Sequence, residues 1–297
     1  MLGNVRMKPA AREFVLTVSC RDAKGIVYAV SGVLFQGGCN IIDSQQFGDP
    51  ASGLFFLRVH FEAPEHLAAV DRLQMLFEST RDKFGMTAQF HELSTRSRVL
   101  LMVSRQGHCL NDLLFRWKSD QLPVDVVGVA SNHTDLQSLS ETYGVPFHHL
   151  PIAAGASDDE RRGQEGRILD IVVRQHVDLV VLARYMQILS PSLCERLRGR
   201  AINIHHSFLP SFKGANPYRQ AFERGVKLIG ATAHYVSETL DDGPIIEQEV
   251  ERVDHTLDSD ELAAVGRDVE CIALARAVRW HCEHRILLNG DKTVVFR

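Results

Sequence analysis

Apolar runs of strand length, each followed by a helical pattern, constrain the fold of this 297-residue chain most strongly. Arg98–Ser104, Val124–Ala130 and Asp178–Ala183 are almost continuously apolar, which is typical of parallel strands buried on both faces. Alternation of such strands with helices through four or five units predicts a parallel, doubly wound α/β sheet with right-handed crossovers. Ligands bind at the carboxyl ends of the strands in sheets of this kind.

The first ninety residues show a different order of elements. Alternation and helical spacing predict strands at 13–20, 40–43, 54–61 and 87–91, and helices at 26–35 and 64–84. This βαββαβ order is the ferredoxin-like arrangement. A polar joint at 91–97 separates the two halves. The chain is also longer than one core usually allows, so we expect two domains, at 10–93 and 98–297.

Composition excludes several classes of function. The chain is 45% hydrophobic and 24% charged, which is ordinary for a soluble globular protein. A net charge of −4 argues against nucleic acid as a partner, because phosphate contacts call for a basic surface. No apolar run has membrane-spanning length and the N-terminus lacks a signal-peptide core. We therefore expect no membrane partner and a cytoplasmic location.

The cysteines and histidines give little support for a disulfide framework or a metal site. Six cysteines are scattered without CxxC spacing, which favours reduced thiols. His281-Cys282-Glu283-His284 is a cluster of potential ligands near the end of a long helical pattern. No second cluster completes a tetrahedral set, so we predict that the protein holds no metal.

A short strand predicted at 201–205 carries the residues best suited to chemistry. Asn203 and His205 alternate with apolar residues and should point to the same face, and Pro210 and Gly214 then interrupt the regular structure. An amide donor beside an imidazole forms a minimal acyl-transfer pair, since one stabilises an oxyanion and the other moves a proton. Taken singly, each residue is more often structural.

Two separated motifs resemble the folate-dependent formyltransferase family. Asn203-x-His205 followed by the run at 207–214 (SFLPSFKG) is similar to the family's active-site segment, and residues 230–244 are similar to the strand and loop that deliver its catalytic aspartate. The resemblance covers roughly residues 98–285. It implies a Rossmann-like formyltransferase domain, 10-formyltetrahydrofolate as the substrate rather than a cofactor, and Asn203, His205 and Asp241 as catalytic residues.

The resemblance also implies where the pterin ring of the folate binds. The segment at 184–191, after the fourth predicted strand of the second domain, is similar to the family's pterin-binding loop, although its apolar residues could equally belong to the core. The substrate-binding residues implied are Met186, Gln187, Ile188, Leu189, Val236, Ser237 and Glu238. His206 is either a further substrate-binding residue that affects specificity or a solvent-facing neighbour.

Members of the family differ in the acceptor of the formyl group. The turn at 104–109 lacks the glycines and serines that grip phosphate in relatives acting on a phosphorylated amine, and His206 and Asp242 stand where amine-formylating relatives usually carry proline and glycine. With the extra N-terminal domain, these features resemble members that hydrolyse 10-formyltetrahydrofolate to formate and tetrahydrofolate. Such hydrolysis supplies formate for purine synthesis and balances one-carbon folates. Formyl transfer to an amine acceptor is the alternative.

The N-terminal half resembles the amino-acid-binding regulatory modules called ACT domains. The resemblance rests on Asp22-x-x-Gly25-Ile26, the turn between the first strand and the first helix. It implies that the protein forms a homo-oligomer, a dimer or a tetramer, and binds an amino-acid effector through Asp22, Gly25 and Asn40. A domain that only mediates oligomerisation is the alternative.

Overall fold

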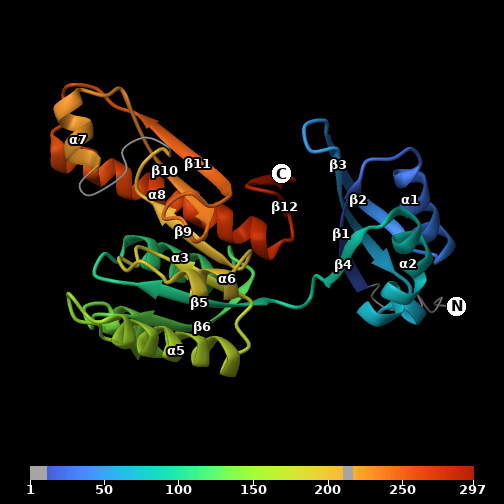
Figure 1. The fold of residues 1–297 in the computed structure, drawn as a ribbon, viewed down its shortest axis with the longest axis horizontal. Helices are drawn as coiled ribbons and strands as arrows, with labels where there is room; N and C mark the ends of the chain where they lie inside the picture. The colour runs from blue at the N-terminus through green and yellow to red at the C-terminus, as the bar shows by residue number, and fades with distance from the viewer. Residues whose placement is uncertain (1–11, 210–216) are drawn as a thin grey trace, which may run out of the picture. The chain divides into compact units, whose positions relative to one another are not determined.

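The computed structural model describes residues 12–209 and 217–297 (Figure 1). They form two compact units. The first contains the described residues up to Thr95, with Glu283–Asn289 and Val294–Arg297; the second contains those of Arg96–Cys282, with Gly290–Thr293. The break predicted at Pro210 and Gly214, and the start of the predicted first domain at residue 10, lie outside the described residues.

An antiparallel sheet and two helices make up the first unit. Its elements are β1 (Arg12–Arg21), α1 (Ile26–Gln36), β2 (Asn40–Asp49), β3 (Leu54–Ala63), a 3-10 turn (Glu65–Leu67), α2 (Val70–Phe84) and β4 (Thr87–Glu92). The strand order is β2-β3-β1-β4, so the predicted βαββαβ arrangement is confirmed. The second helix begins later than predicted because Ala69, extended at φ −153°, separates the 3-10 turn from α2.

The core of the first unit follows the two periodicities seen in the sequence. Every second residue from Phe14 to Cys20 is buried in one cluster with one face of α1, at Ile26, Val30 and Leu34. Successive side chains of a strand point to opposite faces, and helix positions four apart share a face, so this pattern places the helices on one side of the sheet. The β2 edge of the sheet is largely exposed.

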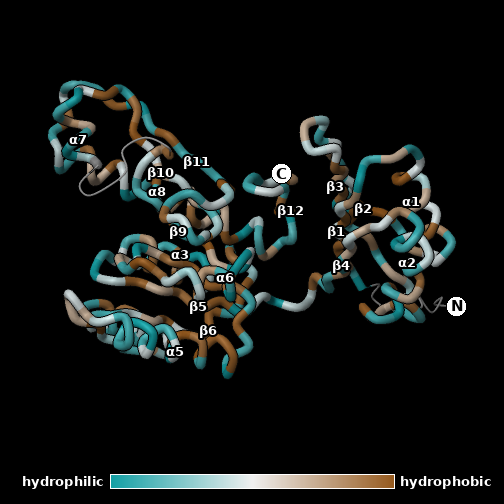
Figure 2. The backbone as a smooth tube through the Cα atoms, in the orientation of Figure 1, coloured by the Kyte–Doolittle hydropathy of each residue, from teal (hydrophilic) through white to brown (hydrophobic). Residues whose placement is uncertain are grey.

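The second unit is a seven-stranded sheet covered by helices. Its elements are β5 (Ser97–Val103), α3 (His108–Lys118), β6 (Val124–Ser131), α4 (Gln137–Thr142), β7 (Phe147–His149), α5 (Asp158–Arg174), β8 (Leu179–Leu182), α6 (Pro191–Arg196), β9 (Ala201–His205), α7 (Pro217–Arg224), β10 (Leu228–Tyr235), β11 (Ile245–Arg252) and α8 (Ser259–Cys282). Figure 2 shows the apolar character of the strands β5 and β6. A hairpin of β12 (Ile286–Asn289) and β13 (Lys292–Val295) follows. Within the described residues, no helix is both long enough and apolar enough to cross a membrane.

Strand direction changes partway across the seven-stranded sheet. The order is β11-β10-β9-β8-β5-β6-β7, and the strands from β9 to β7 are parallel. The predicted parallel sheet is thus confirmed for five of the seven strands, whereas the last two, β10 and β11, are antiparallel to their neighbours. Only residues 236–244 join β10 to β11, and a connection without a crossover helix permits antiparallel pairing alone.

Parallel pairing brings three separate segments to one edge of this sheet. The strands β5, β8 and β9 are neighbours and run in the same direction. The turn at 104–107, the loop at 183–190 and His206 therefore all follow the carboxyl ends of adjacent strands. This is the edge at which open α/β sheets bind ligands.

Candidate active site

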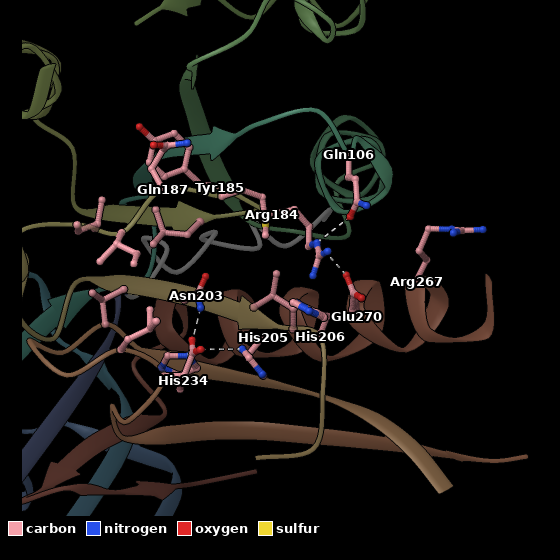
Figure 3. A pocket seen from close by; sticks show the side chains of 18 of the residues that line it. Gln106, Arg184, Tyr185, Gln187, Asn203, His205, His206, His234, Arg267 and Glu270 are labelled. Carbon is pink, nitrogen blue, oxygen red and sulfur yellow. Dashed lines mark hydrogen bonds and ion pairs between the residues drawn. The ribbon is translucent and has the colours of Figure 1, made fainter. Parts of the chain in front are cut away.

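Two paired strands carry the polar side chains at the centre of the second unit. In the antiparallel pairing of β9 with β10, Asn203 lies directly opposite His234. Residues opposite one another project to the same face of a sheet. As a result, Nδ2 of Asn203 lies 3.2 Å from Nε2 of His234 (Figure 3).

The tautomer of His234 follows from the hydrogen-bond partner of its Nδ1. Nδ1 lies 2.8 Å from the carbonyl oxygen of Tyr235, which can only accept a hydrogen bond, so Nδ1 carries the proton. Nε2 is then the acceptor and the amide of Asn203 the donor. Burial lowers the pKa of His234 and favours this neutral form. His234 thereby fixes the orientation of the Asn203 amide.

Asp241 lies against the imidazole of His205. Its Oδ2 is 3.1 Å from Nδ1 of His205, and its Oδ1 is 3.8 Å from Nε2 of His234. Burial acts to raise the pKa of Asp241, but the hydrogen bond from His205 and the neighbouring imidazoles outweigh it, so the pKa is lowered. Asp241 is therefore a carboxylate at neutral pH. The outer nitrogen of His205, Nε2, is buried and has no partner among the described residues.

A tight turn after β10 holds Asp241 in place. Asp241 has φ 55°, a left-handed conformation that aspartate tolerates better than most residues. Two residues later, a Cβ on Gly243 would lie 1.8 Å from the carbonyl oxygen of Tyr235. Only glycine lets the chain approach β10 this closely, and the N–H of Tyr235 then donates to the carbonyl of Pro244 at 2.9 Å.

All the residues predicted to be catalytic or substrate-binding surround one cavity of about 770 Å³. They are Asn203, His205, Asp241, Met186, Gln187, Ile188, Leu189, His206, Val236, Ser237 and Glu238. Met186 and Ile188 are 58% and 67% exposed, which excludes a core position for their side chains, whereas Leu189 is buried. A cavity of this size is typical of sites for small organic ligands.

A second polar cluster lines the same cavity and was missed by the sequence analysis. It is centred on Glu270 of α8, which is 1% exposed. The carboxylate lies 2.7 Å from Nε2 of His108, accepts a hydrogen bond from Tyr218 at 2.7 Å, and lies 3.5 Å from Nε of Arg184. These contacts outweigh the effect of burial and lower the pKa of Glu270, so it is charged. A carboxylate within an otherwise mostly apolar stretch of α8 was the only signal in the sequence.

One group within the described residues has the donor types of a metal site. The ligand atoms of His108, Cys109 and Glu270 lie within 4.8 Å of one another. The carboxylate of Glu270 is already bonded to His108 and Tyr218, and the guanidinium of Arg184 beside it would repel a cation. We therefore describe the group as a hydrogen-bonded network. In the run at 281–284, where no metal was predicted, His281 is hydrogen-bonded to Tyr235 at 2.7 Å.

The three predicted effector residues lie at two different places in the first unit. Gly25 begins α1 in a left-handed conformation, φ 92°, and Asp22 precedes it in the same turn. Asn40 lies beyond the other end of α1, where it lines a shallow hollow with Tyr28 and Phe35 and donates a hydrogen bond to Glu62. The structure thus separates Asn40 from the other two residues.

Comparison with known proteins identifies the family. The formyl transferase family model matches residues 97–278. The formyltetrahydrofolate deformylase of Corynebacterium sp. (strain P-1) is 52% identical over 95% of this chain and 98% of its own length. The chain belongs to the formyltetrahydrofolate deformylase family. The crystal structure of the formyltetrahydrofolate deformylase from Burkholderia mallei is similar over 96% of this chain and 100% of its own, with a TM-score of 0.90 and 52% identity.

Formyltetrahydrofolate deformylases share their second unit with amine-formylating enzymes. The glycinamide ribonucleotide transformylase of Symbiobacterium toebii superposes on 68% of this chain and 95% of its own, with a TM-score of 0.63 and 28% identity. The deformylase from Burkholderia mallei matches the first unit as well, since the match spans 96% of the chain. The resemblance to the formyltransferase family found in the sequence is thus confirmed.

Proposed function

We propose that this protein hydrolyses 10-formyltetrahydrofolate to formate and tetrahydrofolate. The observation that carries the proposal is the contact of Asp241 with His205, 3.1 Å apart, beside Asn203 in a cavity of about 770 Å³. Membership of the formyltetrahydrofolate deformylase family supplies the substrate. The use of the formate in purine synthesis and the balance of one-carbon folates stay predictions from the resemblance.

The cavity offers a pterin ring both apolar faces and polar edges. Met186 and Ile188 project their side chains into solvent-accessible space at the cavity wall, where a flat ring can cover them. The backbone of Gln187 and Leu189, on an irregular loop, supplies donors and acceptors for the ring edge. Val236, Ser237 and Glu238 line the cavity as well, in the loop that leads to Asp241. Folate binding on this loop brings the formyl group toward Asp241.

The chemistry requires a water molecule, a base and an oxyanion donor. Asp241 stabilises the protonated imidazole of His205, so the pair takes a proton as water attacks the formyl carbon. The amide of Asn203, oriented by His234, stabilises the tetrahedral oxyanion, an effect of about 3 kcal/mol for one well-placed donor. The C–N10 bond then breaks, N10 receives a proton, and formate and tetrahydrofolate leave.

Formate release without an amine tests this function. Purified protein given 10-formyltetrahydrofolate alone should release formate and tetrahydrofolate in equal amounts, measured by a coupled formate assay. The alternative function, formyl transfer to an amine, predicts folate binding without formate release. That outcome would contradict hydrolysis.

We also propose that the first unit pairs with a second copy and regulates the enzyme through an amino acid. Apolar side chains are exposed on α1 and β2, among them Tyr28 (84%) and Phe35 (80%), and β2 is an edge strand. Exposed apolar groups beside an open sheet edge favour association. The turn of Asp22 and Gly25 is the proposed effector contact, whereas Asn40, the first residue of β2, follows the other end of α1. The six free cysteines support a reducing compartment, the cytoplasm.

Sedimentation of the wild type and of Phe35→Glu tests the pairing. The wild type should sediment as a dimer or tetramer, and the charged side chain should shift the protein toward the monomer because it is costly to bury. Val173→Glu, at an exposed position on α5 (69%), is the matched control and should leave the assembly unchanged. A monomeric wild type would contradict the proposal. Amino acids that alter turnover in the wild type should lose their effect in Asp22→Ala.

A further inference from the structure

Arg184 occupies an unfavourable backbone conformation at the carboxyl end of β8. Its φ is 67°, in the left-handed region that residues with a Cβ rarely adopt. Neighbouring hydrogen bonds hold it there: its carbonyl accepts from the N–H of Ser104 at 3.2 Å, and the N–H of Met186 donates to Oγ of Ser104 at 2.9 Å. Strained residues that are held this firmly cluster at functional sites.

The side chain of Arg184 is a buried cation in the wall of the cavity. Arg184 is 8% exposed, and its Nε donates to Oε1 of Gln106 at 3.0 Å and lies 3.5 Å from Oε2 of Glu270 (Figure 3). Its Nη1 is buried and has no hydrogen-bond partner among the residues that the structure describes. Burying such a charge is costly, and the carboxylate of Glu270 offsets the cost.

One partner of Arg184, Gln106, belongs to the turn at 104–109, which grips phosphate in relatives acting on a phosphorylated amine. In this chain Gln106 is bonded to Arg184, and His108 is bonded to Glu270 at 2.7 Å. The two side chains of the turn therefore contact the protein itself. Gln106, Arg184 and Glu270 thus form a bonded polar cluster in the wall of the cavity.

This cluster extends to the catalytic centre through His206. The ring of His206 stacks on that of His205, with centroids 5.0 Å apart, and lies 6.3 Å from the ring of Tyr218. Burial and the charge of Arg184 lower the pKa of His206 to about 4, so His206 is uncharged at neutral pH. Arg184, paired with Glu270, thus provides a fixed positive charge next to His206.

We propose that Arg184, held by Glu270 and Gln106, is the specificity-determining residue that selects water over primary amines as the formyl acceptor. The inference rests on the proposed function. A primary amine in neutral water is mostly an ammonium ion, and the buried guanidinium, whose Nη1 has no hydrogen-bond partner among the described residues, disfavours a second cation at this wall of the cavity. In the excluded reaction, the amine nitrogen bonds to the formyl carbon, the C–N10 bond breaks, and a proton moves from the amine to N10.

The substitution Arg184→Gly tests this role. Glycine adopts φ 67° without strain and removes the guanidinium, while Glu270 keeps His108 and Tyr218 as partners, so the variant is expected to fold. Enzyme, 10-formyltetrahydrofolate and an excess of glycinamide are incubated, and N-formylglycinamide and formate are quantified by mass spectrometry. The ratio of formylated amine to formate should rise at least tenfold over that of the wild type.

Two further variants make the test decisive. Asparagine tolerates the left-handed conformation and has a shorter, uncharged side chain. Arg184→Asn should therefore raise the ratio too. Asp120→Gly is the control: it places glycine at another left-handed position, φ 55°, on the surface and away from the cavity. This variant should leave the ratio unchanged.

The inference would be overturned if both Arg184 variants release formate with an unchanged ratio. It would equally be overturned if both bind tetrahydrofolate but lose all turnover, because Arg184 would then be required for the chemistry itself, or if both lose folate binding. Failure of the wild type to release formate contradicts the proposed hydrolysis instead, and formylation of glycinamide by the variants would still support the role of Arg184.

Discussion

Asp241→Asn is expected to reduce kcat for formate release by about 10²–10⁴-fold, the usual contribution of positioned acid–base groups. Asparagine has nearly the same size as aspartate but carries no negative charge, so it cannot stabilise the protonated imidazole of His205, 3.1 Å away. The pterin contacts proposed at 186–189 are untouched. The dissociation constant for tetrahydrofolate, measured by calorimetry, should therefore change by only a few-fold.

A matched control tests whether the loss of a negative charge lowers kcat only when the charge is at the site. Asp254→Asn makes the same chemical change at an exposed position, where the carboxylate bonds only to Thr256 among the contacts that the structure gives it. Its kcat should equal that of the wild type. Near-normal turnover in Asp241→Asn would remove Asp241 from the mechanism.

Gly243→Ala should abolish most turnover without unfolding the protein. The added methyl group would lie 1.8 Å from the carbonyl oxygen of Tyr235, a backbone atom that cannot rotate away, so the turn must move off β10. Asp241 lies two residues earlier and would move with it. A displacement of about 1 Å at a catalytic group costs on the order of 10²-fold in rate.

Gly163→Ala is the control for this substitution. A Cβ at Gly163 in α5 would meet no atom within 4 Å, and alanine favours helix, so both activity and thermal stability should be retained. For Gly243→Ala, the melting temperature should fall only modestly while kcat falls steeply. Full activity in this variant would mean that the turn adapts without moving Asp241.

Local patterns were sufficient for most elements and for the central residues of the site. Alternation at Asn203 and His205 predicted the strand β9 and the shared face of these two side chains, and both line the cavity. The βαββαβ order of the first unit followed from the same kind of signal. The roles assigned to these residues stay predictions until the variants are measured.

Features that depend on tertiary pairing could not be predicted. His234 contacts Asn203 because β10 pairs with β9 in one register, which no local pattern records. The antiparallel direction of β10 and β11 was missed for the same reason. Glu270 and Tyr218 meet across 52 positions of sequence, so the charged cluster appears only when α7 and α8 are placed in space.

The pairing of β9 with β10 makes the contact of Asn203 with His234 independent of the chain that connects the two strands. Asn203 and His234 are 31 positions apart, yet their contact depends only on strand register, and a slip of one residue would turn His234 to the opposite face. The connection between β9 and β10 plays no part in this contact; it includes α7 and supplies Tyr218, which lines the cavity. We therefore expect that changes in the length or composition of this connection can alter acceptor preference while Asn203, His205 and Asp241 stay in position. Engineering of new formyl acceptors should begin there.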